Sequence, residues 1–145
     1  MPSKELYELD QYAWLEESIK EIRSGVMPAL DCIVDYLDEM TDGIKGGLDS
    51  QMTRLLAHLL KWEYQPEKRT TSWSQSIFGD RASIRSHAKN TNLKKYLATE
   101  LEDNYKEGRK WAAKETKLNL NAFPTECEYS MEQLLDSDFF PGIKD

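Results

Sequence analysis

Five polar residues between positions 54 and 69 have the types and spacing of an anion-binding or partner-binding face: Arg54, His58, Lys61, Gln65 and Arg69. The first four recur every three or four positions, so a helix places them on one side. Arginine binds phosphate or carboxylate through paired hydrogen bonds, and histidine can change its charge near neutral pH. The structural alternative is that these groups pair with carboxylates of a neighbouring helix.

A second cluster is acidic and lies between positions 31 and 42: Asp31, Asp35, Asp38, Glu39 and Asp42. Spacings of four and seven turn several of these carboxylates toward one side of a helix, and carboxylate oxygens suit Mg²⁺ or Mn²⁺. A metal-dependent enzyme that uses Asp35, Asp38 and His58 is therefore one alternative function. A solvated or salt-bridged face is the simpler interpretation, so we expect no metal and no other cofactor.

Aromatic residues provide a third feature. Trp62 and Trp73 bracket a segment that contains Lys68 and Arg69, an arrangement that can stack nucleic-acid bases or simply anchor a loop. Trp14 lies opposite the apolar face of its helix, which predicts contact with the C-terminal tail or with another protein. No phosphate-binding loop, dinucleotide fingerprint, zinc-protease motif or paired CxxC motif is present in the sequence.

Helical periodicity dominates the elements that must position these residues, and no segment alternates with a period of two. The pattern predicts one all-α domain over residues 1–145, a bundle of five main helices with a short C-terminal helix and an extended tail. The predicted helices cover residues 6–23, 28–40, 48–64, 72–88 and 93–116, and a short one begins after Ser130. Gly43, Gly46 and Gly47 predict a break after the second helix. The third helix is the most apolar and is expected to be central.

Charge is divided along the chain, whose net charge is −7. Residues 1–50 carry 4 Lys and Arg against 12 Asp and Glu, residues 51–98 carry 9 against 3, and residues 99–145 carry 6 against 11. A basic middle flanked by acidic arms fits either internal pairing or an anionic partner. With no export signal, no membrane-spanning run and only 2 cysteines, we expect a cytoplasmic protein with reduced thiols and no membrane partner.

The run at residues 55–69, followed by Ser72-Trp73, resembles the signature of the "domain of unknown function 29" family. Residues 7–14, residues 115–118 with Phe123-Pro124, and residues 133–135 are similar to the same family. The resemblance implies an all-helical bacterial protein and implies no activity. Cys32 and Tyr36 depart from the family pattern, which weakens the case for a polar site on the acidic helix.

The sequence favours a non-enzymatic protein-interaction module. One alternative is a nucleic-acid or phosphate-binding module, related to nucleases, that uses the basic face of residues 54–85. Another is the metal-dependent enzyme that uses the acidic face of residues 31–42.

Overall fold

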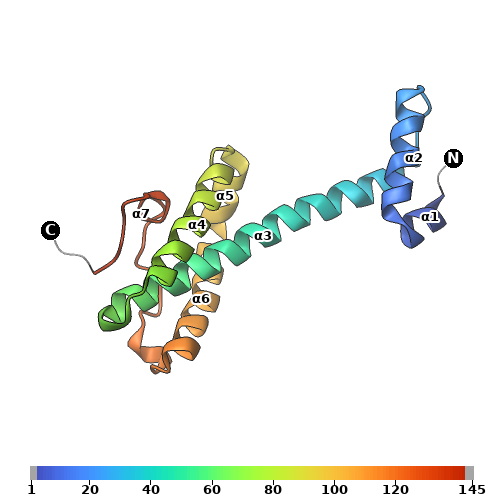
Figure 1. Ribbon diagram of the computed structural model, residues 1–145. Helices are drawn as coiled ribbons and strands as arrows, with labels where there is room; N and C mark the ends of the chain where they lie inside the picture. Colours follow the sequence, from blue (N-terminus) through green and yellow to red (C-terminus); the bar gives the residue numbers. More distant parts are fainter. Residues whose placement is uncertain (1–2, 143–145) are drawn as a thin grey trace. The chain divides into compact units, whose positions relative to one another are not determined.

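The computed structural model describes residues 3–142, and in that range it is all-α, as the periodicity predicts. No strand occurs among these residues, and none of their helices is long and apolar enough to cross a lipid bilayer. The elements, shown in Figure 1, are α1 (Lys4–Leu9), α2 (Gln11–Arg23), α3 (Leu30–Tyr64), η1 (Pro66–Lys68), α4 (Thr71–Ala88), α5 (Thr91–Thr99), α6 (Leu101–Thr116), η2 (Leu120–Ala122) and α7 (Met131–Leu135).

The predicted break at residues 41–47 is wrong, because α3 runs unbroken for 35 residues. Each interior glycine costs about 1 kcal/mol relative to alanine, but it removes no helical hydrogen bond, whereas proline does. No proline occurs between Leu30 and Tyr64. The turns that follow the glycines are held by buried Leu48 and Met52, and tertiary packing of this kind overrides a weak local preference.

Other helix boundaries also differ from the prediction. The helix predicted over residues 6–23 divides at Asp10, whose carboxylate caps α2 by accepting from the Ala13 N–H at 3.0 Å. The helix predicted over residues 93–116 divides at Glu100 into α5 and α6. The helix predicted over residues 72–88 begins at Thr71 as α4, with Thr70 as its cap. The short helix predicted after Ser130 is confirmed as α7, which opens with a capping box formed by Ser130 and Gln133.

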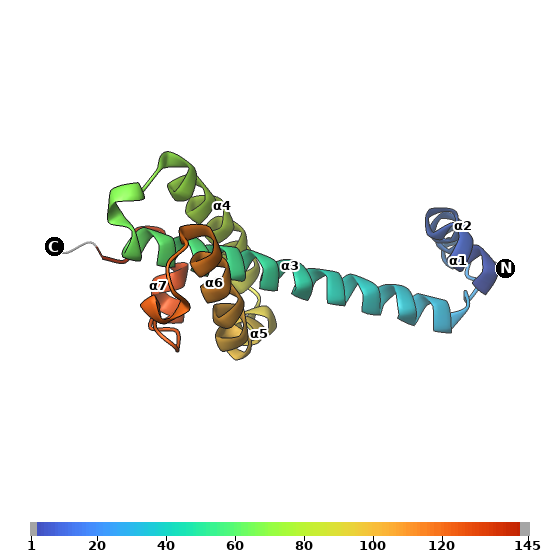
Figure 2. The same cartoon turned by 90° about the horizontal axis from the view of Figure 1, so that it is seen from below.

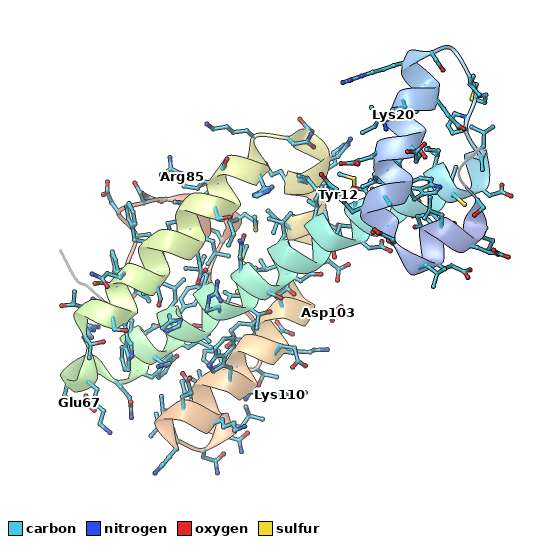
Figure 3. All side chains as sticks on the ribbon, turned by 45° about the vertical axis from the view of Figure 1, so that its right-hand side comes forward. Tyr12, Lys20, Glu67, Arg85, Asp103 and Lys110 are labelled. Atoms are coloured by element: carbon cyan, nitrogen blue, oxygen red, sulfur yellow. The ribbon has the colours of Figure 1, made fainter. Side chains whose placement is uncertain are left out.

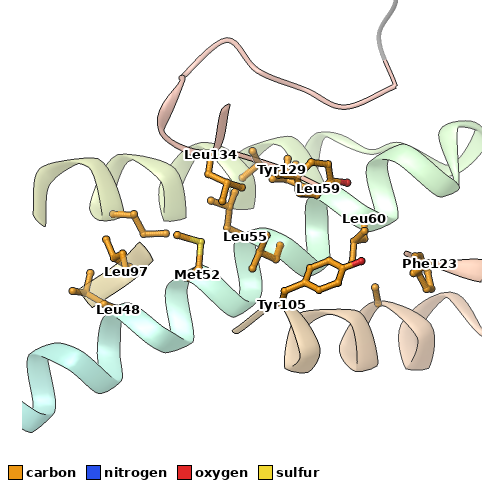
Figure 4. Packing of buried hydrophobic residues seen from close by; sticks show 14 residues of the cluster. Leu48, Met52, Leu55, Leu59, Leu60, Leu97, Tyr105, Phe123, Tyr129 and Leu134 are labelled. Carbon is orange, nitrogen blue, oxygen red and sulfur yellow. The ribbon is translucent and has the colours of Figure 1, made fainter. Parts of the chain in front are cut away.

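The chain forms two compact units, Met1–Ile44 and Lys45–Asp145. The expectation of a single domain over residues 1–145 stays a prediction. In the second unit, the part of α3 after Ile44 supplies Leu48, Met52, Leu55 and Leu59 to the core, so the prediction of a central helix is confirmed there. Figure 4 shows these side chains meeting residues of α5, α6 and the C-terminal tail. The other buried apolar residues of this core are Leu56, Leu60, Ile77, Ile84, Leu97, Tyr105, Ala112, Phe123, Tyr129 and Leu134.

Helix α6 approaches α3 closely at Gly108. A Cβ atom added there meets the Thr53 carbonyl oxygen at 2.9 Å and the Leu56 Cβ at 3.1 Å. Ala112, one turn later, is fully buried. The small residues at these two positions therefore let α3 and α6 pack closely.

The segment after α6 packs across the second unit, as expected for the tail. Lys117 ends α6 in a left-handed conformation with φ of 60°. Tyr105 donates to the Pro124 carbonyl at 2.5 Å, and Tyr129 donates to the Glu63 carboxylate at 2.5 Å. Phe123 lies buried against Tyr64, with ring centroids 5.3 Å apart.

The first unit has a small core built around Trp14, which is fully buried rather than available to the tail or to another protein. Its ring packs edge-on against Tyr7 at 4.9 Å and lies 6.1 Å from Tyr36 at the start of α3. Gln11 donates to Glu39 at 3.1 Å and ties α2 to the same turns. Figure 2 shows α1 and α2 beside the first turns of α3.

Candidate functional site

The basic residues predicted as a binding face lie on successive turns of α3 and just after η1, and most of them already have partners. Arg54 holds Asp80 of α4 in a bidentate ion pair, with nitrogen–oxygen distances of 2.6–3.1 Å. The Asp80 side chain is 7% exposed and the Arg54 side chain is 45% exposed. This bidentate hydrogen bond raises the pKa of Arg54. The guanidinium therefore neutralises a buried carboxylate and links α3 to α4.

Lys61 lies within the fold rather than on its surface. Its Nζ donates to the Glu115 carboxylate at 2.6 Å and lies 4.7 Å from the centre of the Trp73 ring. Burial alone raises the pKa of Glu115, but hydrogen bonds from Lys61 and Trp111 outweigh burial and leave that pKa below its usual value. Lys61 thus joins α3 to α6 and α4.

Gln65 and Arg69 hold the turn that ends α3. Gln65 is buried. Arg69 donates from Nε to the Trp62 carbonyl at 2.9 Å, and its guanidinium stacks 4.9 Å from the centre of the Trp62 ring. The aromatic and cationic side chains of this segment therefore contact each other, which is the loop-anchoring interpretation.

His58 is half-buried, and its Nδ1 lies 2.9 Å from the Arg54 carbonyl oxygen. Burial lowers the pKa of His58, and the positive charge of Lys61 lowers it further. The hydrogen bond with the Arg54 carbonyl raises this pKa but does not outweigh burial. Its ring lies 6.4 Å from Trp111. Beside Trp111 is a hollow of about 570 Å³, lined also by Thr53, Glu107, Lys110, Lys114 and Glu115. The site prediction for the five basic residues stays a prediction, since no ligand is assigned to them.

The acidic face of α3 is exposed and lies in the first unit. Within residues 3–142, no ion pair involves Asp31, Asp35, Asp38 or Asp42. The basic residues of α3 therefore pair with Asp80 and Glu115 instead of these aspartates. Across the same described range, no three His, Cys, Asp or Glu side chains are grouped closely enough to hold a metal ion.

One set of large apolar side chains on α3 remains exposed. An apolar stripe on α3, called here the α3 stripe, consists of Leu30, Val34, Leu37, Met40 and Ile44, and its members are 45–59% exposed. Helix α2 likewise exposes Tyr12, Ile19 and Ile22, and Figure 3 shows Tyr12 at the surface of α2. Periodicity finds such a stripe but cannot tell whether this chain or another molecule covers it.

A family model described as "Domain of unknown function DUF29" matches residues 6–140 of the chain. Neither the proteins of curated function nor the solved structures include a match.

Proposed function

The chain belongs to the family described as "Domain of unknown function DUF29", a description that names no activity, and we propose that it is a non-enzymatic protein-interaction module. The observation that carries the proposal is the exposed α3 stripe. Soluble proteins that work alone rarely expose a contiguous patch of large apolar side chains. Such a patch is typical of a surface that another molecule covers.

The spacing of the stripe fits a helical partner. Leu30, Val34, Leu37 and Ile44 follow the alternating steps of four and three residues that define a coiled-coil seam, with Thr41 at the remaining position. A seam with this repeat stays aligned with a second helix along its length. We therefore propose that the partner presents a helix with apolar residues in the same repeat.

Charge identifies the kind of helix. Residues 1–44 carry 3 Lys and Arg against 11 Asp and Glu. The exposed carboxylates of Asp31 and Asp38 border the stripe, and those of Asp35 and Asp42 lie further round the same side of the helix. A second copy of this chain brings like charges together, whereas a basic amphipathic helix pairs with them. The proposed partner is therefore a lysine- or arginine-rich amphipathic helix of another protein.

Two designed peptides test this proposal. Both carry leucine at the apolar heptad positions; one has lysine and the other glutamate at the flanking positions. Fluorescence polarisation with the full chain is expected to show binding of the lysine peptide only. Added salt is expected to weaken this binding, because exposed charge pairs are screened.

Matched variants locate the contact. V34D/L37D is expected to weaken binding of the lysine peptide more than about tenfold, because each large apolar side chain contributes about 1.5–3 kcal/mol when fully buried. D38K reverses a charge beside the stripe and should also weaken binding of the lysine peptide. Controls are L120D, at an exposed leucine of η2, and D103K, at an exposed carboxylate of α6 seen in Figure 3.

The outcomes separate the parts of the proposal. Equal binding of both peptides overturns the basic partner, and unchanged binding by V34D/L37D overturns the α3 stripe as the contact. Self-association of the chain that V34D/L37D abolishes, measured by analytical ultracentrifugation, shows that a second copy is the occupant. Absence of binding to either peptide, without self-association, overturns the interaction module itself.

A further inference from the structure

Arg81 of α4 is a buried cation that forms no ion pair with a carboxylate of residues 3–142. The residue is 2% exposed, and its Nε donates to the Leu134 carbonyl at 2.8 Å. Its Nη2 atom is buried and has no hydrogen-bond partner among residues 3–142. A buried N–H group left without an acceptor is costly, and a buried guanidinium more so. Arg81 therefore differs from Arg54, whose Nε and Nη2 both donate to the Asp80 carboxylate.

The charge of Arg81 is only weakly balanced by its surroundings. No ion pair within 4.0 Å involves it in the described part of the chain. Burial lowers the pKa of Arg81. The negative charge of Asp136 raises that pKa in part, and the positive charge of Arg85 lowers it further. The Phe140 ring, 5.8 Å away, presents its face to the guanidinium. An anion beside this group removes the cost of burying it unpaired.

A hollow of about 340 Å³ lies beside Arg81, near the lower end of the volumes typical of small-ligand pockets. Its lining consists of Ser74, Gln75, Phe78, Arg81, Ser137 and Phe140. Two of these residues are aromatic and Arg81 is the only cation among them. Phe78 is 70% exposed although it is a large apolar residue. The hollow thus combines aromatic walls with one buried positive charge and polar groups at its edge.

We propose that this hollow binds the carboxylate of a small aromatic acid, with Arg81 donating to the carboxylate and Phe78 and Phe140 packing on the ring. The site is separate from the α3 stripe and does not rest on the function proposed above. A monoanion is favoured over a dianion because Nε of Arg81 already donates to the Leu134 carbonyl and because Asp136 adds negative charge nearby. A phosphate dianion typically needs further cations or a helix N-terminus.

The first test uses benzoate, with benzamide as its neutral isostere and phenyl phosphate as the dianion. Titration of the full chain, followed by amide chemical shifts in NMR, is expected to show saturable millimolar binding of benzoate, with shifts at α4 and at residues 134–140. Benzamide is expected to bind at least about tenfold more weakly, since it cannot form charge-assisted hydrogen bonds. Absence of saturable benzoate binding, equal binding of benzamide or tighter binding of phenyl phosphate overturns the proposal.

Variants then assign the binding to Arg81. R81M keeps apolar volume but removes the charge, and it is expected to abolish benzoate binding. R85M removes an exposed arginine one turn further along α4, seen in Figure 3, and should weaken benzoate binding far less than R81M does. F78A alters an exposed side chain, so it should fold normally and still weaken binding. The assignment to Arg81 is refuted if a folded R81M still binds benzoate, or if R85M weakens binding as much as R81M does. If R81M fails to fold, F78A decides, and unchanged benzoate affinity in F78A refutes the proposed site.

Discussion

Replacing Gly108 with alanine tests the close approach of α6 to α3 and should destabilise the protein. The added Cβ lies 2.9 Å from the Thr53 carbonyl oxygen, 3.1 Å from the Leu56 Cβ and 3.3 Å from the Ala57 nitrogen. Two of these atoms belong to the backbone of α3, so a side-chain rotation cannot relieve the clash. Overpacking costs about 1–3 kcal/mol, and alanine returns about 1 kcal/mol of helix preference. The difference between these two contributions is an expected net loss of up to about 2 kcal/mol in the free energy of unfolding.

Urea denaturation followed by circular dichroism measures this loss, and Gly79 provides the matched control. Gly79 lies inside α4, and a Cβ added there meets no atom within 4 Å. Gly79→Ala is therefore expected to stabilise the protein by up to about 1 kcal/mol, whereas Gly108→Ala is expected to lower the urea midpoint by up to about 1 M. If both variants raise the midpoint, α6 does not approach α3 as described and the reasoning fails.

Three further predictions concern the second unit. Leu59→Ala should cost about 2–5 kcal/mol in urea unfolding because Leu59 is fully buried, and a variant as stable as the parent contradicts its place in the core. Arg54→Met should destabilise more than Asp80→Asn, since it leaves a buried charge without its partner at a cost of about 1–3 kcal/mol; the reverse order in thermal melts argues against this pair. Burial raises the pKa of Cys127 to about 11, whereas an unfolded cysteine titrates near about 8.5. Iodoacetamide should therefore label Cys127 more slowly in the folded than in the urea-unfolded protein at pH about 9. The Cys127 thiol loses its proton at lower pH in the unfolded chain than in the folded one, so the free energy of unfolding should fall as pH rises from about 8.5 to about 11. Equal labelling rates in the folded and unfolded protein contradict the burial of this thiol.

Apolar spacing was sufficient to predict the helical class and the central place of the turns after Leu48. It could not locate boundaries set by single backbone groups. The break at Glu100 has no glycine or proline beside it, and Leu93, Leu97, Leu101 and Tyr105 keep a four-residue spacing across it. The signal at Asp10 was an ordinary capping residue. The break expected at the glycines near position 45 failed because helix preference is a small energy per residue.

The functional residues were harder to predict for a different reason. The sequence shows that Arg54 and Lys61 are cations on one helical face, but it cannot show that Asp80 and Glu115 lie opposite them. It also cannot distinguish a stripe that packs within the chain from one that remains exposed. Trp14, which was expected to contact the tail or another protein, is buried in the first unit, and Leu37 of the α3 stripe is exposed. Both assignments depend on contacts between elements, which local spacing does not encode.

Because the first unit has a small core, the stability of its folded state should depend on what binds it. Among residues 3–44, the buried positions are Trp14, Ser18, Pro28 and Cys32. A unit that buries so little of its own surface has a small stability margin. A partner present at about a hundredfold above its dissociation constant adds about 2.7 kcal/mol to the folded state. Proteases act on transiently unfolded chains, so if the proposed helical partner exists, the lifetime of this protein in a cell is expected to follow that partner's concentration.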